Sequence, residues 1–177
     1  MKILIAYATT DGQTRKIARF ACDRLVDAGH GVELLSVDDA EGLDLNRFDG
    51  VILGGSLHAG HYQKSLTQFV TEAKVALAAK PTLLLAVSLL GAGDDSGQWT
   101  GSDKCLAEFM ADTGWTPGRV EHVAGAFRFS EYDFRAWAMR QIADQKGDAV
   151  EAGKDKEYTD WVKMETVLDD WVAGIAA

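Results

Sequence analysis

The feature that most constrains the fold of this chain is the regular alternation of short apolar runs with amphipathic segments. Three of the runs are nearly continuous, at residues 3–7, 51–53 and 83–87. Runs of this length are typical of parallel strands that are buried on both faces. One intervening segment places its apolar residues at helical spacing: Leu66, Phe69, Val70, Ala73 and Leu77. The alternation therefore predicts an α/β fold built of strand–helix units.

Five strands are predicted along the 177 residues, which favours a single domain with one open, doubly wound parallel sheet. The strands are expected at Lys2–Tyr7, Gly31–Ser36, Gly50–Leu53, Thr82–Ser88 and Val120–Ala126. Right-handed crossovers favour the strand order 2-1-3-4-5. One later helix is expected to be capped by Ser102 or Asp103, and a final helix is expected to begin near Asp160. A ligand of such a sheet binds at the carboxyl ends of the strands, beside strand one.

Charge and cysteine content exclude several classes of protein. A net charge of −9 argues against nucleic acid as a partner, because such binding rests on clustered Lys and Arg. No apolar run approaches the roughly eighteen residues of a membrane-spanning helix. Cys22 and Cys105 lie on different expected helices, no signal peptide is recognisable, and no Cys/His spacing indicates a metal site. We therefore expect a cytoplasmic protein with free thiols and no metal, with at most a peripheral contact at the inner face of the cell membrane.

The loop after the first strand has the composition of an anion site. It comprises residues 9–14, Thr-Thr-Asp-Gly-Gln-Thr, and leads directly into a helix. Free backbone N–H groups and the positive end of the helix dipole favour an anion there, and the threonine hydroxyls add hydrogen bonds. Gly12 allows close approach of the backbone. Neither G-x-x-x-x-G-K-[ST] nor G-x-G-x-x-G is present, so the loop suits the terminal phosphate of a mononucleotide.

Two points leave an alternative open for this loop. A threonine-capped strand–helix turn that binds nothing has the same appearance, and every parallel α/β protein contains such turns. Asp11 is also unfavourable beside a phosphate. Its carboxylate is expected to point away, so that only its backbone N–H contributes.

The loops after strands three and four offer contacts for a flat ring. Residues 54–62 supply glycines for close backbone approach and three planar side chains, and residues 88–93 offer backbone N–H groups to a ring carbonyl. The alternative for the first of these loops is a solvated surface loop, and Trp99 either stacks on a ligand or covers the helix beneath it. Together with residues 9–14, which we call the phosphate loop, these features match FMN. Its phosphate would lie on residues 9–14 and its isoalloxazine between the other two loops.

An insertion at approximately 127–157 separates the fifth strand from the final helix. Its first part is rich in aromatic residues and arginines, and from Tyr132 it is predicted to be a helix with Asp133, Arg140 and Asp144 on one face. Its second part, 147–157, is polar and is predicted to be a mobile loop. An ordinary extra helix and a lid or docking surface beside the ligand are both open. Aromatics and arginines suit a flat molecule that bears carboxylates.

Four sequence blocks match a known family, in order, along nearly the whole chain. They are T-x-D-G-Q-T-x-x-I-A at 9–18, G-x-S-x-x-x-G-H-Y at 54–62, A-G-A-[LF]-R-[YF] at 124–129 and Y-T-D-W at 158–161. On these blocks the chain resembles the flavodoxin-like, menaquinone-dependent protoporphyrinogen IX dehydrogenases of bacterial haem synthesis. The resemblance implies a flavodoxin-like fold, FMN as cofactor, and oxidation of protoporphyrinogen IX to protoporphyrin IX with a quinone as acceptor. Asp11 is a residue that this family carries.

The loops and the resemblance together indicate the site residues. The residues expected to bind the cofactor are Thr9, Thr10, Asp11, Gly12, Gln13, Thr14, Ser56, Leu57, His58, Gly60, His61, Tyr62, Ser88, Leu89, Leu90 and Gly91. The first six border the phosphate and the others border the ring. No side chain is a compelling general base. The reactive atom would be N5 of FMN, which the protein mainly positions and polarises. Arg128, at the end of strand five, and Arg135 are the candidates for contacts with the propionates of the porphyrinogen.

The insertion departs from the pattern of this family, whose members carry a strongly basic, apolar helix there. Residues 127–146 contain four basic and three acidic side chains, which weakens the expected contact with an anionic membrane surface. A soluble quinone reductase with another substrate and a flavodoxin-type electron carrier therefore stay open. The net acidic charge favours the carrier, since it suits docking on basic partners. A phospho-receiver is disfavoured, because residues 54–56 are Gly-Gly-Ser where a receiver needs aspartate.

Overall fold

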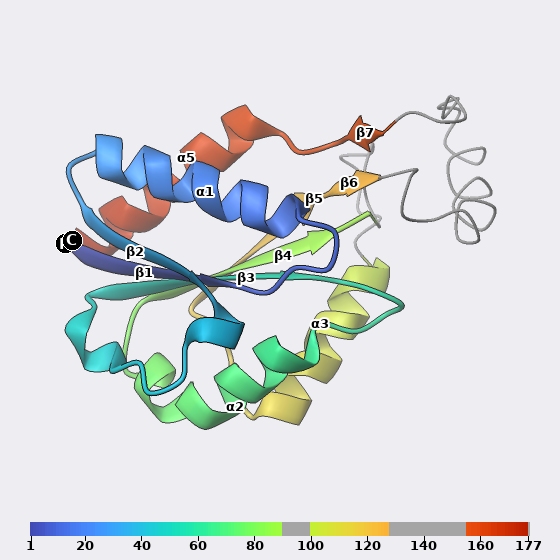
Figure 1. Cartoon of the computed structure of the whole chain (residues 1–177), viewed down its shortest axis with the longest axis horizontal. Coiled ribbons are helices and arrows are strands. Elements are labelled where there is room, and N and C mark those ends of the chain that lie inside the picture. The colour runs from blue at the N-terminus through green and yellow to red at the C-terminus, as the bar shows by residue number, and fades with distance from the viewer. Residues whose placement is uncertain (90–99, 128–154, 177) are drawn as a thin grey trace.

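The structure, a computed structural model, describes residues 1–89, 100–127 and 155–176. Its centre is a parallel five-stranded sheet in the order β2-β1-β3-β4-β5, which confirms the predicted order (Figure 1). The strands are β1 (Lys2–Tyr7), β2 (Gly31–Ser36), β3 (Gly50–Ser56), β4 (Thr82–Ser88) and β5 (Arg119–Ala124). The chain switches direction across the sheet between β2 and β3, so the carboxyl ends of β1 and β3 form the switch point where ligands bind.

Within the described residues, two long helices cover each face of the sheet (Figure 1). The pair on one face is α1 (Gln13–Asp27) and α5 (Trp161–Ala176), and the pair on the other is α2 (Lys64–Ala78) and α3 (Thr100–Thr113). Side chains of β1 alternate between the two cores: Ile3 packs with α1 and α5, whereas Leu4 packs with α2 and α3. Cys22 on α1 and Cys105 on α3 are free thiols on opposite faces of the sheet.

β3 extends beyond its predicted end at Leu53, as far as Ser56. The extension occurs because Gly54 and Gly55 pair in register with β4, although glycine is a poor strand former. A side chain at Gly55 has no space, since a Cβ there would lie 2.3 Å from Leu66 Cδ2. The absence of a side chain at Gly55 thus lets α2 pack closely against the end of the strand.

Two other boundaries differ from the prediction. α3 begins at Thr100, so Ser102 and Asp103 lie within its first turn and neither is its cap. β5 ends at Ala124, earlier than predicted, because Gly125 separates it from a further two-residue strand. The final helix begins as predicted, directly after residue 160. Two short 3₁₀ helices, η1 (Val37–Asp39) and η2 (Leu45–Arg47), lie between β2 and β3.

Two short strands join the ends of the insertion. β6 (Ala126–Phe127) pairs antiparallel with β7 (Lys156–Glu157), near the start of α1 (Figure 1). We call residues 126–127 and 156–161 the stem. The last residues of the predicted mobile loop therefore form a strand, so that part of the prediction was wrong. The predicted helix from Tyr132 and the loop residues 147–154 lie outside the described residues, and no helix in the described part is long and apolar enough to cross a membrane.

Candidate functional site

The loop between β1 and α1 is compact and tied to β3. Gly12, the last residue before α1, has a φ of 86°, a left-handed conformation that favours glycine. Its N–H donates to Thr9 Oγ1 at 2.9 Å, and the Ala8 N–H donates to the Gly54 carbonyl at the same distance. A Cβ at Gly54 would lie 3.1 Å from Thr14 Cγ2, closer than ordinary van der Waals contact, so the loop and the strand pack tightly here. The first turn of α1 is therefore held against the carboxyl end of β3.

Three threonine hydroxyls in this loop retain a proton for a ligand. Thr9 Oγ1 accepts from the Gly12 N–H, and Thr10 Oγ1 accepts from Gln63 Nε2. Each of these hydroxyls uses a lone pair in that bond, so its one proton is left for another acceptor. Thr14 Oγ1 is buried and has no hydrogen-bond partner within the described residues. Buried hydroxyls are nearly always bonded, and the oxygen of an anion at the N-terminus of α1 would satisfy this one.

Gln13 was expected to help hold the phosphate, but its side chain is used elsewhere. Nε2 donates to Thr159 Oγ1 at 2.9 Å and to Glu157 Oε2 at 3.1 Å. Glu157 Oε2 also accepts from Lys16 Nζ at 2.6 Å, and its Oε1 accepts from Trp161 Nε1 at 2.9 Å. The side chain of Gln13 therefore attaches the stem to α1, and only its backbone N–H is left for a phosphate.

The Glu157 carboxylate is kept ionised by these donors. Burial raises the pKa of Glu157, but the hydrogen bonds from Lys16, Trp161 and Gln13 outweigh burial and hold the pKa below its usual value. Thr159 completes the cluster, since its hydroxyl donates to the Ala124 carbonyl at 2.7 Å. The stem is thus joined both to α1 and to the end of β5.

The loop after β3 makes a tight turn that faces the phosphate loop. His58 and His61 exchange backbone hydrogen bonds of 2.9 and 3.1 Å. Between them, Ala59 and Gly60 both have positive φ, 51° and 84°, as in a type I′ turn. Asp11 Oδ2 lies 3.9 Å from His58 Nδ1. The carboxylate that is unfavourable beside a phosphate therefore faces this turn.

Tyr62 was expected to contact the ring of a ligand but belongs to the core. It is 6 % exposed, and its ring packs against Phe109 of α3 with the ring centroids 4.9 Å apart. Its hydroxyl is buried without a hydrogen-bond partner in the described part of the chain, and burial raises the pKa of Tyr62. The ring of Tyr62 is therefore covered by α3.

Gln63 was not among the predicted site residues, yet it joins the two loops. Its Nε2 donates to Ser56 Oγ at 2.7 Å and to Thr10 Oγ1 at 3.1 Å, and its Oε1 accepts from the Ser56 N–H at 3.2 Å. Its carbonyl accepts from the Thr67 N–H in the first turn of α2. No spacing pattern marks Gln63, because Thr10 lies 53 positions away in sequence. The one available signal was an amide directly before an expected helix.

Of the remaining residues predicted to contact the ring, the structure describes Leu57, Ser88 and Leu89. The Leu57 N–H donates to the Val87 carbonyl at 2.9 Å, which holds the β3 loop against the end of β4. Ser88 is buried, its carbonyl accepts from the Gly125 N–H at 3.0 Å, and Leu89 is partly buried. Several residues lie outside the described ranges, so their roles stay predictions: Leu90, Gly91, Trp99, Arg128 and Arg135.

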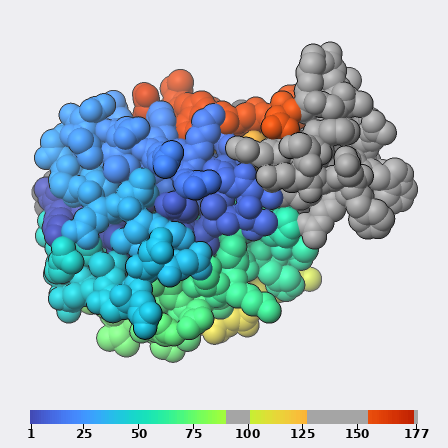
Figure 2. Space-filling view, viewed as in Figure 1, coloured from blue at the N-terminus to red at the C-terminus, as the bar shows by residue number. Residues whose placement is uncertain are grey.

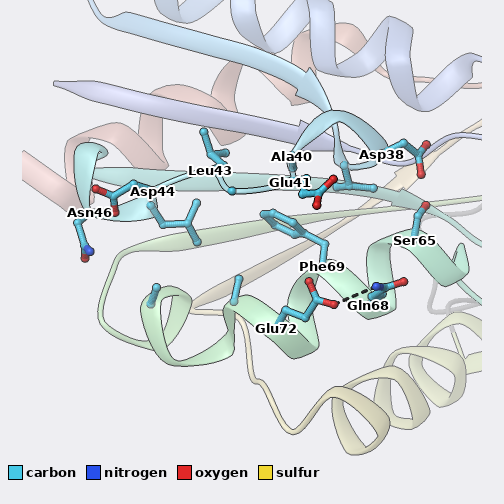
Figure 3. Close-up of a pocket in the computed structure, with 15 residues that line it drawn as sticks. Asp38, Ala40, Glu41, Leu43, Asp44, Asn46, Ser65, Gln68, Phe69 and Glu72 are labelled. Atoms are coloured by element: carbon cyan, nitrogen blue, oxygen red, sulfur yellow. Dashed lines mark hydrogen bonds between the residues drawn. The ribbon is translucent and has the colours of Figure 1, made fainter.

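A separate hollow of about 640 Å³ lies between residues 37–46 and α2 (Figure 3). Figure 2 shows these two segments, cyan and green, side by side on the surface. The side chain of Phe69 points into the hollow. The acidic residues that line it are Asp38, Glu41, Asp44 and Glu72. Neither the threonines of the phosphate loop nor the histidines of the β3 turn line it, so the candidate site is formed by loops and not by this hollow.

Sequence comparisons agree with this architecture. A family model described as a flavodoxin domain matches residues 4–163. Protoporphyrinogen IX dehydrogenase [quinone] of Escherichia coli (strain K12) is 28 % identical over 165 residues, which cover 93 % of this chain and 91 % of that protein. A protein of the same name from Leishmania major is 26 % identical over 97 % of this chain and 75 % of its own length.

Solved structures share the fold at lower identity. A flavodoxin from the domain Archaea superposes with a TM-score of 0.57 over 100 % of both chains, at 14 % identity. Flavodoxin 2 from Bacillus cereus gives the same TM-score at 19 % identity, over 98 % of this chain and 99 % of that one. These matches support the doubly wound sheet.

Proposed function

Because the chain belongs to the flavodoxin domain family, we propose that it is an FMN-dependent oxidoreductase that oxidises protoporphyrinogen IX to protoporphyrin IX and reduces a quinone. The named relatives, which align with most of its length, place it among the oxidoreductases. One observation carries the choice of cofactor: the buried Thr14 hydroxyl has no partner in the described residues and lies at the N-terminus of α1. A phosphate oxygen would complete that hydroxyl.

The residues present fit this cofactor in two parts. The hydroxyls of Thr9, Thr10 and Thr14, with N–H groups from the first turn of α1, would hold the phosphate. Residues 56–61 and the end of β4 would border the ring. When bound, FMN supplies a two-electron acceptor that the side chains of the chain lack. The protein's own part is to orient that acceptor and to keep its phosphate in place.

The overall reaction consists of three two-electron oxidations of the porphyrinogen. Each removes two electrons and two protons and converts one quinone into a quinol, which would make the chain an enzyme of haem biosynthesis. Arg128 and Arg135 are proposed to bind the propionates. The insertion is proposed as the contact with the inner face of the membrane, where a lipid-soluble quinone resides.

The second candidate is a flavodoxin-type electron carrier, and the net charge of −9 favours it. Acidic carriers dock on basic partner proteins through complementary potentials. A carrier and a dehydrogenase would share the phosphate loop, so that loop does not separate them. A soluble quinone reductase with another substrate has the same cofactor requirement.

Two measurements test the proposal in order. The purified protein, or the protein after addition of FMN, should show the absorbance bands of an oxidised flavin. Under anaerobic conditions, protoporphyrinogen IX and a quinone should then yield porphyrin fluorescence faster than an enzyme-free control. A protein that takes up no FMN contradicts both candidates. A flavoprotein with no rate above the control contradicts the dehydrogenase and favours the carrier or another reductase.

A further inference from the structure

The side-chain amide of Gln63 has a defined orientation. A backbone N–H is only a donor, so the amide atom 3.2 Å from the Ser56 N–H must be the carbonyl oxygen. The NH₂ group must then face the other way, where it meets Ser56 Oγ at 2.7 Å and Thr10 Oγ1 at 3.1 Å. Both of its protons are used, one for each hydroxyl.

This orientation fixes the hydrogen-bond direction of the two hydroxyls. Thr10 Oγ1 and Ser56 Oγ each accept from Gln63, so each must donate its own proton to a different group. Thr10 stands in the phosphate loop, and Ser56 stands at the end of β3, on the side expected to border the ring. Two loops that are far apart in sequence thus each present a hydroxyl donor beside Gln63.

From this arrangement we propose that Gln63 is a positioning residue that makes the Thr10 hydroxyl an obligate donor and so selects a phosphorylated flavin over an unphosphorylated one. The inference rests on the proposed function, since it takes FMN as the ligand. Gln63 does not touch the phosphate. It acts through the hydroxyl of Thr10. Without the N–H of Gln63 as a donor, that hydroxyl could direct its proton toward residue 63 and away from the phosphate.

Gln63→Glu is the most informative variant, because it keeps the shape of the side chain and reverses the direction of its hydrogen bonds with the two hydroxyls. A carboxylate still accepts from the Ser56 N–H, but it also accepts from both hydroxyls and turns the Thr10 proton away from the expected phosphate. Every local hydrogen-bonding group remains satisfied, so the melting temperature of the cofactor-free protein should change little. Gln68→Glu is the matched control for the added charge, since Gln68 lies exposed on α2, the helix that Gln63 precedes, and its side-chain amide donates to Glu72 of the same helix.

The experiment compares the dissociation constants of FMN and riboflavin for the cofactor-free full chain. For Gln63→Glu we expect FMN to bind about tenfold more weakly, equivalent to about 1.4 kcal/mol, while riboflavin changes by less than about twofold. Gln68→Glu should leave both constants within about twofold of wild type. Equal weakening of FMN and riboflavin would overturn the inference, because it would indicate a general disturbance of the site.

A double-mutant cycle with Thr10→Val separates positioning from simple charge repulsion. If Gln63 acts through Thr10, Gln63→Glu should weaken FMN binding clearly less in the Thr10→Val background than in wild type. The same fold-loss in both backgrounds would overturn the inference. Wild-type protein that binds neither flavin would instead contradict the proposed function, so the two failures are distinguishable.

Discussion

The phosphate loop and the stem of the insertion meet at the first turn of α1, but their polar groups are satisfied differently. On the stem side, Glu157 accepts hydrogen bonds from three side chains, and Thr159 both accepts and donates. On the loop side, Thr14 is buried with a hydroxyl that has no partner in the described part of the chain. Adjacent residues of one helix thus serve different ends: Gln13 holds the structure together, and Thr14 is left for a ligand.

Replacing Thr14 with valine should give the largest effect, and it should appear in ligand binding alone. We expect FMN affinity to fall about tenfold to a hundredfold, because a hydrogen bond to a charged group contributes about 1.5–3 kcal/mol. The cofactor-free protein should not lose stability, since the variant removes an unpaired buried hydroxyl without changing the volume. Titration of FMN and urea unfolding of the same preparation check both statements. Unchanged FMN affinity would show that the loop does not bind the phosphate.

Thr159→Val should do the opposite, lowering stability and sparing the ligand. The variant leaves the Ala124 carbonyl without its donor and removes one acceptor of Gln13, so the free energy of unfolding should fall by about 1–2 kcal/mol. FMN affinity should stay within about twofold of wild type. Thr166→Val is a matched control, because the exposed Thr166 hydroxyl donates to the Val162 carbonyl of its own helix. A large loss of FMN affinity in Thr159→Val would contradict the expectation that the stem affects stability and the phosphate loop affects ligand binding.

The Glu157 cluster should make stability depend on pH in the acid range. The folded-state pKa of Glu157 lies below its usual value, so its contribution is present above the unfolded pKa of about 4.3. The contribution is lost as the pH falls through the lower, folded pKa. Its size should be below about 1 kcal/mol, because the carboxylate is partly exposed. Unfolding curves of wild type and Glu157→Gln should therefore differ at pH 7, and the difference should shrink as the pH falls below about 4.3. A constant difference over that range would mean that the carboxylate charge is not involved.

The smallest effect is expected at the other end of α1, where Arg24 pairs with Asp169 of α5 on the surface. Hydrogen bonding and the charge of Arg24 lower the pKa of Asp169, but solvent screens exposed pairs strongly. Asp169→Asn should change the free energy of unfolding by less than about 0.5 kcal/mol and should leave FMN binding unaltered. A change as large as that in Thr159→Val would show that this surface pair contributes as much to stability as the contacts of the stem.

Periodicity in the sequence was sufficient for the sheet, because buried parallel strands are continuous apolar runs and few connections satisfy right-handed crossovers. It was not sufficient for the end of β3, where Gly54 and Gly55 are poor strand formers that close packing requires: Gly54 lies against Thr14, and Gly55 lies against Leu66 of α2. It also could not show β6 and β7, because two-residue strands have no period and their pairing joins segments on either side of the insertion.

The candidate site was predictable where the helix terminus alone dictates the chemistry, as for the threonines of the phosphate loop. The roles of Gln13, Tyr62 and Gln63 depend on which distant segment packs beside each of them. Gln13 meets the stem, Tyr62 meets α3 and Gln63 meets the phosphate loop. The sequence around each residue does not indicate which distant segment will pack beside it.

The pairing of β6 with β7 has a consequence for how this protein can change over evolutionary time. A segment whose two ends are already held together adds little entropy to the folding of the rest, and doubling its length would add only about 0.6 kcal/mol. Residues between Phe127 and Lys156 can therefore be lengthened, shortened or replaced while the five-stranded sheet and the phosphate loop stay as they are. The stem thus makes the insertion an exchangeable module on an unchanged core.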